Sequence, residues 1–358
     1  MIRILKSISL FLKIICFILE ANAQSKNTFL TIKADSISFI SKPSEYKIAG
    51  TLSYPLNKKT CPAIVLVAGS GPHTREEIIS GTPIFSEMAT YFNQLGYAVI
   101  RIDKRGYGLS EGSNSVDSVT TAQLSEDILG AIQFLKKHNK IDASNIGIIG
   151  HSEGAWIAEM IALKDTSVKW LVLLGAHAVS GAIIQEDQMT ANLLRRGAEK
   201  EVVEKVRPQI KRIIDFVVND NLNDSIFFAI GKDFLLGHGM KEENITKKLI
   251  NQLLDGFRSP WNRYFFGHSP ANQISLLKIP TLFIYGSKDK QVDPELNIGP
   301  LIEIMKSYER NNMTLNILSD HDHFFLHYSG KSLEKHKFGE MHVSKIMLDT
   351  IKNWLLLN

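Results

Sequence analysis

Ile146-Gly147-Ile148-Ile149-Gly150-His151-Ser152-Glu153-Gly154-Ala155 reads as a short apolar strand, a tight turn between two glycines and the start of a helix. A serine on such a turn presents its Oγ beyond the edge of the sheet, and the flanking glycines relieve backbone crowding. The amino end of the following helix also favours developing negative charge. The pattern therefore predicts that Ser152 is a nucleophile at the carboxyl edge of a sheet.

Short apolar, β-branched runs alternate with amphipathic stretches along the chain, which is typical of an α/β sheet with helices on both faces. One helix is expected from Thr121 to His138, where Leu124, Ile128 and Leu135 share a stripe. A closing helix is expected from about Phe338 to Leu357. Its predicted buried face consists of Val343, Ile346, Met347, Ile351 and Trp354. The expected strands, of which the first two form an antiparallel edge, are 36–40, 47–54, 63–68, 98–102, 146–149, 170–174, 281–285 and 314–318.

The strand pattern is interrupted between Val179 and about Leu277, where helical stripes replace it. One stripe contains Ile210, Ile213, Ile214 and Val217, and another contains Leu249, Ile250, Leu253 and Leu254. A strand-free insertion between two sheet strands predicts a helical cap over one end of the sheet. The expected organisation is a core of 24–178 and 278–358, split by a cap at 179–277.

Residues 1–23 resemble a secretory signal peptide. Arg3 and Lys6 precede an apolar run, and Ala21-Asn22-Ala23 is a small-residue cleavage site. Cleavage after Ala23 and export follow as expectations. An uncleaved membrane anchor and a lipid-modified Cys16 are the alternatives, although the run is short for a span.

Charge and cysteine content narrow the range of partners. Removing 1–23 changes the balance of basic to acidic residues from 41 against 37 to 38 against 36, which gives no electrostatic footprint for nucleic acid or an anionic membrane. Only Cys61 then remains, so no internal disulfide can form.

A nucleophilic serine needs a base, and the base needs an orienting acid. Asp289 follows the predicted strand 281–285, and His323 follows the predicted strand 314–318. Asp293 and His321 are the rivals. Asp293 precedes a proline and could instead begin a helix, and whichever histidine is not the base is expected to be an ordinary surface residue.

Backbone N–H groups should form the oxyanion hole. Glu153 N–H directly follows the nucleophile, and Ser70 N–H lies in the turn Gly69-Ser70-Gly71-Pro72, which could alternatively be only a tight turn. No cofactor is expected. The cluster His321-Asp322-His323 does not indicate a metal site, because no other histidine or cysteine pair has suitable ligand spacing.

Four motifs together resemble the α/β-hydrolase superfamily, in particular bacterial carboxylesterases related to the catalytic domains of prolyl-oligopeptidase-type enzymes. They are Val67 to Pro72, Arg101 to Ser110, Gly150 to Gly154, and Gly286 to Val292. The resemblance implies that Asp289 is the catalytic acid, that His323 is the base, and that Asp103 and Arg105 only shape a turn. Ala68 departs from the histidine that many relatives have before this glycine.

The predicted function is hydrolysis of carboxylic esters, with short acyl chains expected because the cap would enclose a small site. Trp261 and Phe265, together with Tyr264 and Phe266, could form an apolar pocket wall or the cap core. An acyl-peptide or aminopeptidase-like activity and a thioesterase activity remain alternatives. A protein of another class, an inactive hydrolase-fold binding protein, also remains open, but the order Ser, Asp, His argues against it.

Overall fold

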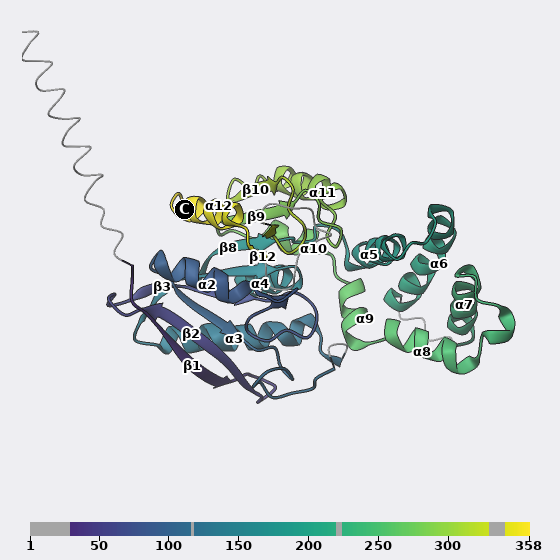
Figure 1. The fold of residues 1–358 in the computed structure, drawn as a ribbon, viewed down its shortest axis with the longest axis horizontal. Coiled ribbons are helices and arrows are strands. Elements are labelled where there is room, and N and C mark those ends of the chain that lie inside the picture. Colours follow the sequence, from purple (N-terminus) through teal and green to yellow (C-terminus); the bar gives the residue numbers. More distant parts are fainter. Residues whose placement is uncertain (1–28, 116–117, 220–223, 329–340) are drawn as a thin grey trace, which may run out of the picture.

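The computed structural model describes residues 29–115, 118–219, 224–328 and 341–358, and its main feature is an eight-stranded sheet. The sheet strands are β1 (Ile32–Ile40), β2 (Lys47–Pro55), β3 (Cys61–Val67), β6 (Ala98–Ile102), β7 (Ile141–His151), β8 (Val168–Leu174), β9 (Thr281–Gly286) and β10 (Met313–Leu318). Their spatial order is β1-β2-β6-β3-β7-β8-β9-β10 (Figure 1). The pairs from β6 to β10 are parallel, whereas β2 is antiparallel to both of its neighbours.

The predicted α/β-hydrolase fold is confirmed, and each predicted strand overlaps one strand of this sheet. The first two strands form the antiparallel edge that their alternating pattern predicts. β7 and β8 begin earlier than their apolar runs do. Two short ladders lie outside the sheet: β4 (Ile78–Ile79) with β5 (Thr82–Pro83), and β11 (Leu326–Tyr328) with β12 (Met341–Val343).

Helices cover both faces of the sheet, which is why its central strands are apolar on both sides. Ile64 and Leu66 of β3 pack with α2 (Ile84–Gln94) and α12 (Lys345–Leu355). Val65 and Val67 face the opposite way, toward α3 (Thr121–Lys137), α4 (Glu153–Lys164) and α11 (Pro294–Ser307). Because the strands from β6 to β10 run parallel, their carboxyl ends lie at one common edge, where the loops that follow them meet.

The closing helix is shorter than expected. α12 begins at Lys345, and Val343 is buried in the strand β12 instead of on the helix. Ile346, predicted to be buried, is 58% exposed, while Met347, Ile351 and Trp354 are buried. Pairing with β11 is a non-local contact that overrides the helical periodicity of this segment. The start predicted near Phe338 lies outside the described residues.

The described residues between β8 and β9 form helices and no strand, and we call α5 to α10 the helical insertion. Ile210, Ile213, Ile214 and Val217 are buried as predicted. In the second stripe Ile250 and Leu254 are buried, whereas Leu249 and Leu253 are half-buried. Its elements are α5 (Gly181–Arg195), α6 (Lys200–Val218), α7 (Asp224–Gly237), η2 (Glu242–Asn244), α8 (Lys247–Phe257), α9 (Pro260–Phe266) and α10 (Pro270–Leu276).

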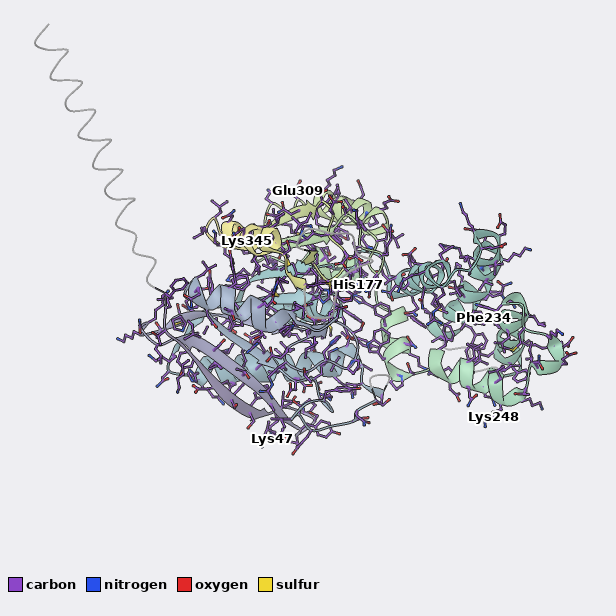
Figure 2. All side chains as sticks on the ribbon, viewed as in Figure 1. Lys47, His177, Phe234, Lys248, Glu309 and Lys345 are labelled. Atoms are coloured by element: carbon purple, nitrogen blue, oxygen red, sulfur yellow. The ribbon has the colours of Figure 1, made fainter. Side chains whose placement is uncertain are left out.

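The helical insertion projects beside one end of the sheet (Figure 1). Within the insertion, Phe216 stacks on Phe227 with ring centroids 4.6 Å apart. Figure 2 places His177 at the junction with the sheet and Phe234 far out in the insertion. α9 and α10 are the helices that return to α3, α4 and α11. A cap function for this segment stays a proposal.

The predicted signal segment 1–23, with Cys16, lies outside the described residues. Among the residues that are described, no helix is both long and apolar enough to cross a membrane.

Candidate active site

Ser152 occupies a sharp turn between β7 and α4. Its backbone has φ 55° and ψ −118°, a conformation that side chains rarely adopt and that costs roughly 1–3 kcal/mol. The surrounding packing imposes it: Ser152 N–H donates to Leu174 O at 2.8 Å. A Cβ on Gly150 would lie 2.2 Å from Gly154 O, and one on Gly154 would lie 2.1 Å from Val67 O. The two glycines of the motif are therefore required by close backbone contacts.

Asp289 and His323 are adjacent at the same edge of the sheet. His323 Nδ1 lies 2.7 Å from Asp289 Oδ2, and both side chains are buried. The other carboxylate oxygen, Oδ1, accepts the N–H groups of Gln291 and Val292, each at 2.8 Å. The acid is therefore held in one orientation by the turn after β9, and it in turn orients the imidazole.

The two rival residues have other partners. Asp293 caps α11 by accepting Glu295 N–H at 2.9 Å, which is the helix-starting role weighed for it above. His321 contacts Ser319 O through Nδ1 at 2.7 Å and Ser344 Oγ through Nε2 at 2.6 Å. His321 is buried, so the expectation that the second histidine would be a surface residue is wrong.

The turn after β3 lies directly beside the nucleophile. A Cβ on Gly69 would lie 3.2 Å from the Cβ of Ser152. Within the described part of the chain, neither Ser70 N–H nor Glu153 N–H donates to a protein acceptor. Both of the predicted oxyanion donors are therefore free to bind a substrate oxygen.

A buried Glu77–His151 pair, which the motifs do not reveal, supports this turn. Glu77 Oε1 accepts Gly69 N–H at 2.9 Å and lies 2.9 Å from His151 Nδ1. His151 Nε2 lies 2.9 Å from His323 O. With Glu77 ionised, both partners of the His151 ring are acceptors, and each ring nitrogen donates to one of them. Burial lowers the pKa of His151, but Glu77 outweighs it and the pKa is raised.

A second buried network surrounds the carboxylate of Glu153. Lys104 Nζ lies 3.2 Å from Glu153 Oε2, and Oε1 accepts both Thr121 Oγ1 and Trp261 Nε1 at 2.7 Å. Burial raises the pKa of this carboxyl, but Lys104, Thr121 and Trp261 outweigh burial and hold the pKa below its usual value. Glu153 is thus an ionised side chain with three donors.

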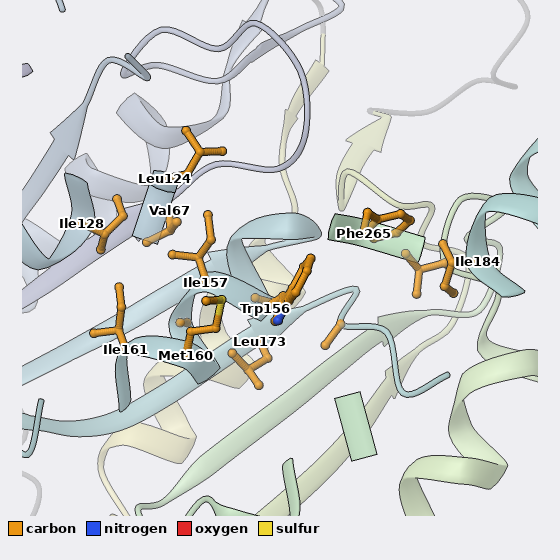
Figure 3. Packing of buried hydrophobic residues seen from close by; sticks show 14 of the residues in the cluster. Val67, Leu124, Ile128, Trp156, Ile157, Met160, Ile161, Leu173, Ile184 and Phe265 are labelled. Atoms are coloured by element: carbon orange, nitrogen blue, oxygen red, sulfur yellow. The ribbon is translucent and has the colours of Figure 1, made fainter. Parts of the chain in front are cut away.

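A cavity of about 180 Å³ opens beside this network. Its lining includes Ser70, Glu153 and Trp261, and Val119 and Leu124 supply apolar wall. Phe265, the other aromatic residue singled out above, lies behind Trp261 with ring centroids 4.8 Å apart and is buried. Figure 3 shows Phe265 and Ile184 of the insertion near Trp156 of α4. Trp261 therefore borders the cavity, whereas Phe265 is in the packed layer behind it.

Asp103 and Arg105 shape the turn after β6. Asp103 binds the Arg75 guanidinium at 2.6 Å, and Arg105 binds Asp127 of α3 at 2.7 Å. Their contacts are those of a structural turn. The sequence motif does not distinguish a role for Lys104, which lies between them. In the described residues, no group of three or more His, Cys, Asp or Glu side chains is arranged to hold a metal ion.

Comparison with known proteins identifies the family of this chain. A family model described as "Serine aminopeptidase, S33" matches residues 63–327. The chain belongs to this family of α/β-hydrolases. That membership confirms the resemblance to the α/β-hydrolase superfamily drawn from the four motifs.

Several of the proteins that this chain resembles are named as esterases. Esterase EstD of Thermotoga maritima is 25% identical over 315 residues, which cover 86% of this chain and 65% of that relative's length. The structure of Est1E from Butyrivibrio proteoclasticus with ferulic acid bound matches with a TM-score of 0.52 at 17% identity, covering 89% of this chain and 98% of that one. Pyrococcus furiosus esterase Pf2001 matches with a TM-score of 0.52 at 16% identity, covering 82% and 84%. The two structural matches support the fold.

Proposed function

We propose that this protein is a serine hydrolase that cleaves carboxylic esters with small acyl groups. Ser152 is the nucleophile, His323 the general base and Asp289 the orienting acid. The observation that carries the proposal is the buried His323–Asp289 pair at 2.7 Å, at the edge where Ser152 is held in its strained turn. The similarity to Thermotoga maritima esterase EstD supports ester substrates.

The chemistry follows from which nitrogen of His323 is free. Its Nδ1–H donates to Asp289, so Nε2 carries the lone pair that takes the Ser152 proton as Oγ attacks the ester carbonyl. The N–H groups of Ser70 and Glu153 stabilise the oxyanion of the tetrahedral intermediate. Histidine then protonates the departing alcohol. Water, activated by the same nitrogen, hydrolyses the acyl-enzyme and releases the acid.

The size of the cavity supports small acyl groups. Its volume is about 180 Å³, and an apolar cavity of roughly 150 Å³ in another protein holds one benzene molecule. One short chain or one ring therefore fits between Trp261 and the Val119–Leu124 wall. A long acyl chain would have to extend out of the cavity.

The family's description makes an aminopeptidase-like activity the second candidate. Such an enzyme must bind the substrate's α-ammonium group, and a carboxylate is the side chain suited to that. Among the described residues that line the cavity, Glu153 is the acidic one, and it already accepts from Lys104, Thr121 and Trp261. This occupied carboxylate favours esters over aminoacyl amides.

The test is a parallel assay of nitrophenyl acetate to octanoate, acyl thioesters and aminoacyl nitroanilides with the wild type and Ser152→Ala. We expect the short esters to be turned over fastest, and Ser152→Ala to reduce kcat by several orders of magnitude. A fluorophosphonate probe should label Ser152 in the wild type. Ser86→Ala, on α2, is the control for loss of a hydroxyl.

Each outcome of this assay separates the candidates. Preference for aminoacyl amides would favour the aminopeptidase, and preference for thioesters a thioesterase. If neither turnover nor labelling depends on Ser152, the protein is better explained as a binding protein with a hydrolase fold. Retention of more than a few per cent of ester turnover in Ser152→Ala, with contamination excluded, would remove Ser152 from its role.

We also propose that the protein is exported and cleaved after Ala23, on the basis of the sequence of residues 1–23. Amino-terminal sequencing of the protein from its native host should then begin at Gln24. Recovery of a chain that still begins at Met1, or that carries lipid on Cys16, would contradict this proposal.

A further inference from the structure

The peptide group between Gly69 and Ser70 is held at one end by a lysine. Lys104 Nζ donates to Gly69 O at 2.5 Å. Gly69 C=O and Ser70 N–H belong to the same planar trans peptide and point in opposite directions. Fixing the carbonyl oxygen therefore fixes the direction of the N–H that the proposed reaction uses.

The same ammonium group also reaches the other wall of the oxyanion hole. Lys104 Nζ lies 3.2 Å from Glu153 Oε2, and Glu153 carries the second proposed N–H donor. The Lys104 side chain is 12% exposed and that of Glu153 is 3% exposed. Little water competes for these bonds, so the pair is stronger than an exposed ion pair. One side chain thus connects the two backbone segments that must be correctly spaced around the oxyanion.

Glu153 extends this connection to the helical insertion. Trp261 of α9 donates its indole N–H to Glu153 Oε1, beside the hydroxyl of Thr121 of α3. A shift of α9 would therefore displace the Glu153 carboxylate, and through it Lys104 and the Gly69–Ser70 peptide.

We propose that Lys104 is a positioning residue for the oxyanion hole, and that the Lys104–Glu153–Trp261 network couples the position of α9 to that hole. The inference rests on the proposed serine-hydrolase function. Lys104 also borders the cavity, but its ammonium group bonds Gly69 O and Glu153, so we assign it a role through the backbone and not in substrate binding. It orients Ser70 N–H, and by accepting electron density from Gly69 O it also makes that N–H a better donor.

The first test is Lys104→Met, which keeps an unbranched chain only one atom shorter and removes the charge. Losing one oxyanion donor in a serine hydrolase costs about 10²- to 10³-fold in kcat, and a misdirected donor should cost about 10- to 100-fold. We expect KM for a short nitrophenyl ester to change less than about threefold. The inhibition constant of an alkyl trifluoromethyl ketone, whose adduct oxygen replaces the oxyanion, should rise by the same factor as kcat falls.

Removing the lysine leaves Glu153 buried without its cation, which can by itself prevent folding. The double variant Lys104→Met/Glu153→Gln removes that charge as well, and it is measured alongside the single variant. We expect it to fold and to show the same loss of kcat and of ketone affinity.

Trp261→Phe keeps an aromatic ring and removes only the N–H donor, so it should lower kcat by a smaller factor, about three- to tenfold, for all esters alike.

The outcomes separate this inference from the proposed function. If the wild type has no Ser152-dependent ester turnover, the proposed function fails. If that turnover is present and the folded lysine variants keep kcat and ketone affinity within twofold of the wild type, only the positioning role fails. A rise in KM with kcat unchanged would likewise overturn it, because the lysine would then act in substrate binding.

Discussion

The carboxyl edge of the sheet and the helical insertion are built in different ways. At the edge, the proposed acid and a neighbour of the nucleophile are fixed by several bonds: Asp289 has three partners, and His151, next to Ser152, uses both ring nitrogens. The insertion has its own core, with Phe216 stacked on Phe227, and reaches the edge through contacts such as Trp261 to Glu153.

This difference indicates where substitutions act strongly and where they act gradually. Groups at the edge have one geometry, because their backbone and side-chain partners determine it together, so losing one should abolish the chemistry. The insertion can shift slightly without losing its core. Changes there should alter the preferred substrate, or the pH range over which the insertion stays packed against the sheet.

The largest effect is expected from the base. His323→Ala should reduce kcat for a short ester by about 10⁴- to 10⁶-fold, since the serine proton then has no acceptor. His321→Ala should cost stability, because one buried and one part-buried hydrogen bond are lost, but should keep turnover per folded molecule within about tenfold. Circular dichroism confirms folding before assay. An inactive His321 variant beside an active His323 variant would move the base two residues upstream.

The acid should show the next largest effect. Asp289→Asn keeps the shape but cannot hold the imidazole in its tautomer, so kcat should fall by about 10³- to 10⁴-fold. Asp293→Asn is the matched control, because asparagine caps a helix as well as aspartate does. Its kcat should remain near that of the wild type. A larger loss for Asp293→Asn than for Asp289→Asn would reverse the assignment.

The sequence predicts the edge better than the parts that support it. Ser152, Asp289 and His323 stand next to predicted strands, and parallel strands bring their ends together, so local patterns suffice to propose them. Glu77 and Lys104 act on the backbone of Gly69, and such contacts have no side-chain motif. They become visible only in three dimensions.

Non-local contacts account for the other differences. The segment Met341–Val343 pairs with β11 and therefore is not helical. His321 is buried because Ser344, which caps α12, lies against its Nε2. Periodicity along the chain carries no information about either partner. The stripes of the insertion, by contrast, depend on local spacing, and Ile210 to Val217 are buried as their spacing predicts.

The junction of the two regions should be sensitive to acid. His177 and His268 are buried there with no partner for either Nε2 among the described residues. Burial lowers the pKa of His177 from 6.5 to about 4 and, together with His177, that of His268 to about 3. Below pH 6.5 the unfolded chain takes up protons that the folded protein does not, so stability falls as the pH decreases toward 4.

His177→Gln tests this sensitivity, because glutamine does not titrate. The loss of unfolding free energy between pH 7 and pH 5, measured by urea denaturation, should be smaller in the variant by about 2 kcal/mol. His268→Gln should give a similar reduction. Parallel stability curves for the wild type and both variants would show that these histidines do not link the two regions to pH.

The smallest expected effect, and the one that best distinguishes the two regions, is a change of acyl preference. Trp261 borders the cavity, whereas Phe265 is buried behind it. Trp261→Ala enlarges the cavity, so the ratio of kcat/KM for hexanoate to that for acetate should rise about tenfold, since one methylene in an apolar pocket is worth roughly 1–3 kcal/mol. Phe265→Ala should instead lower the melting temperature, because truncating a buried phenylalanine costs about 3–5 kcal/mol, and should change that ratio less. Trp261→Phe separates the two consequences of losing tryptophan: it removes the bond to Glu153 but keeps most of the wall, so all esters should slow together. If Trp261→Ala slows every ester equally and also lowers the melting temperature, Trp261 belongs to the insertion's core, and selectivity must come from the sheet edge itself.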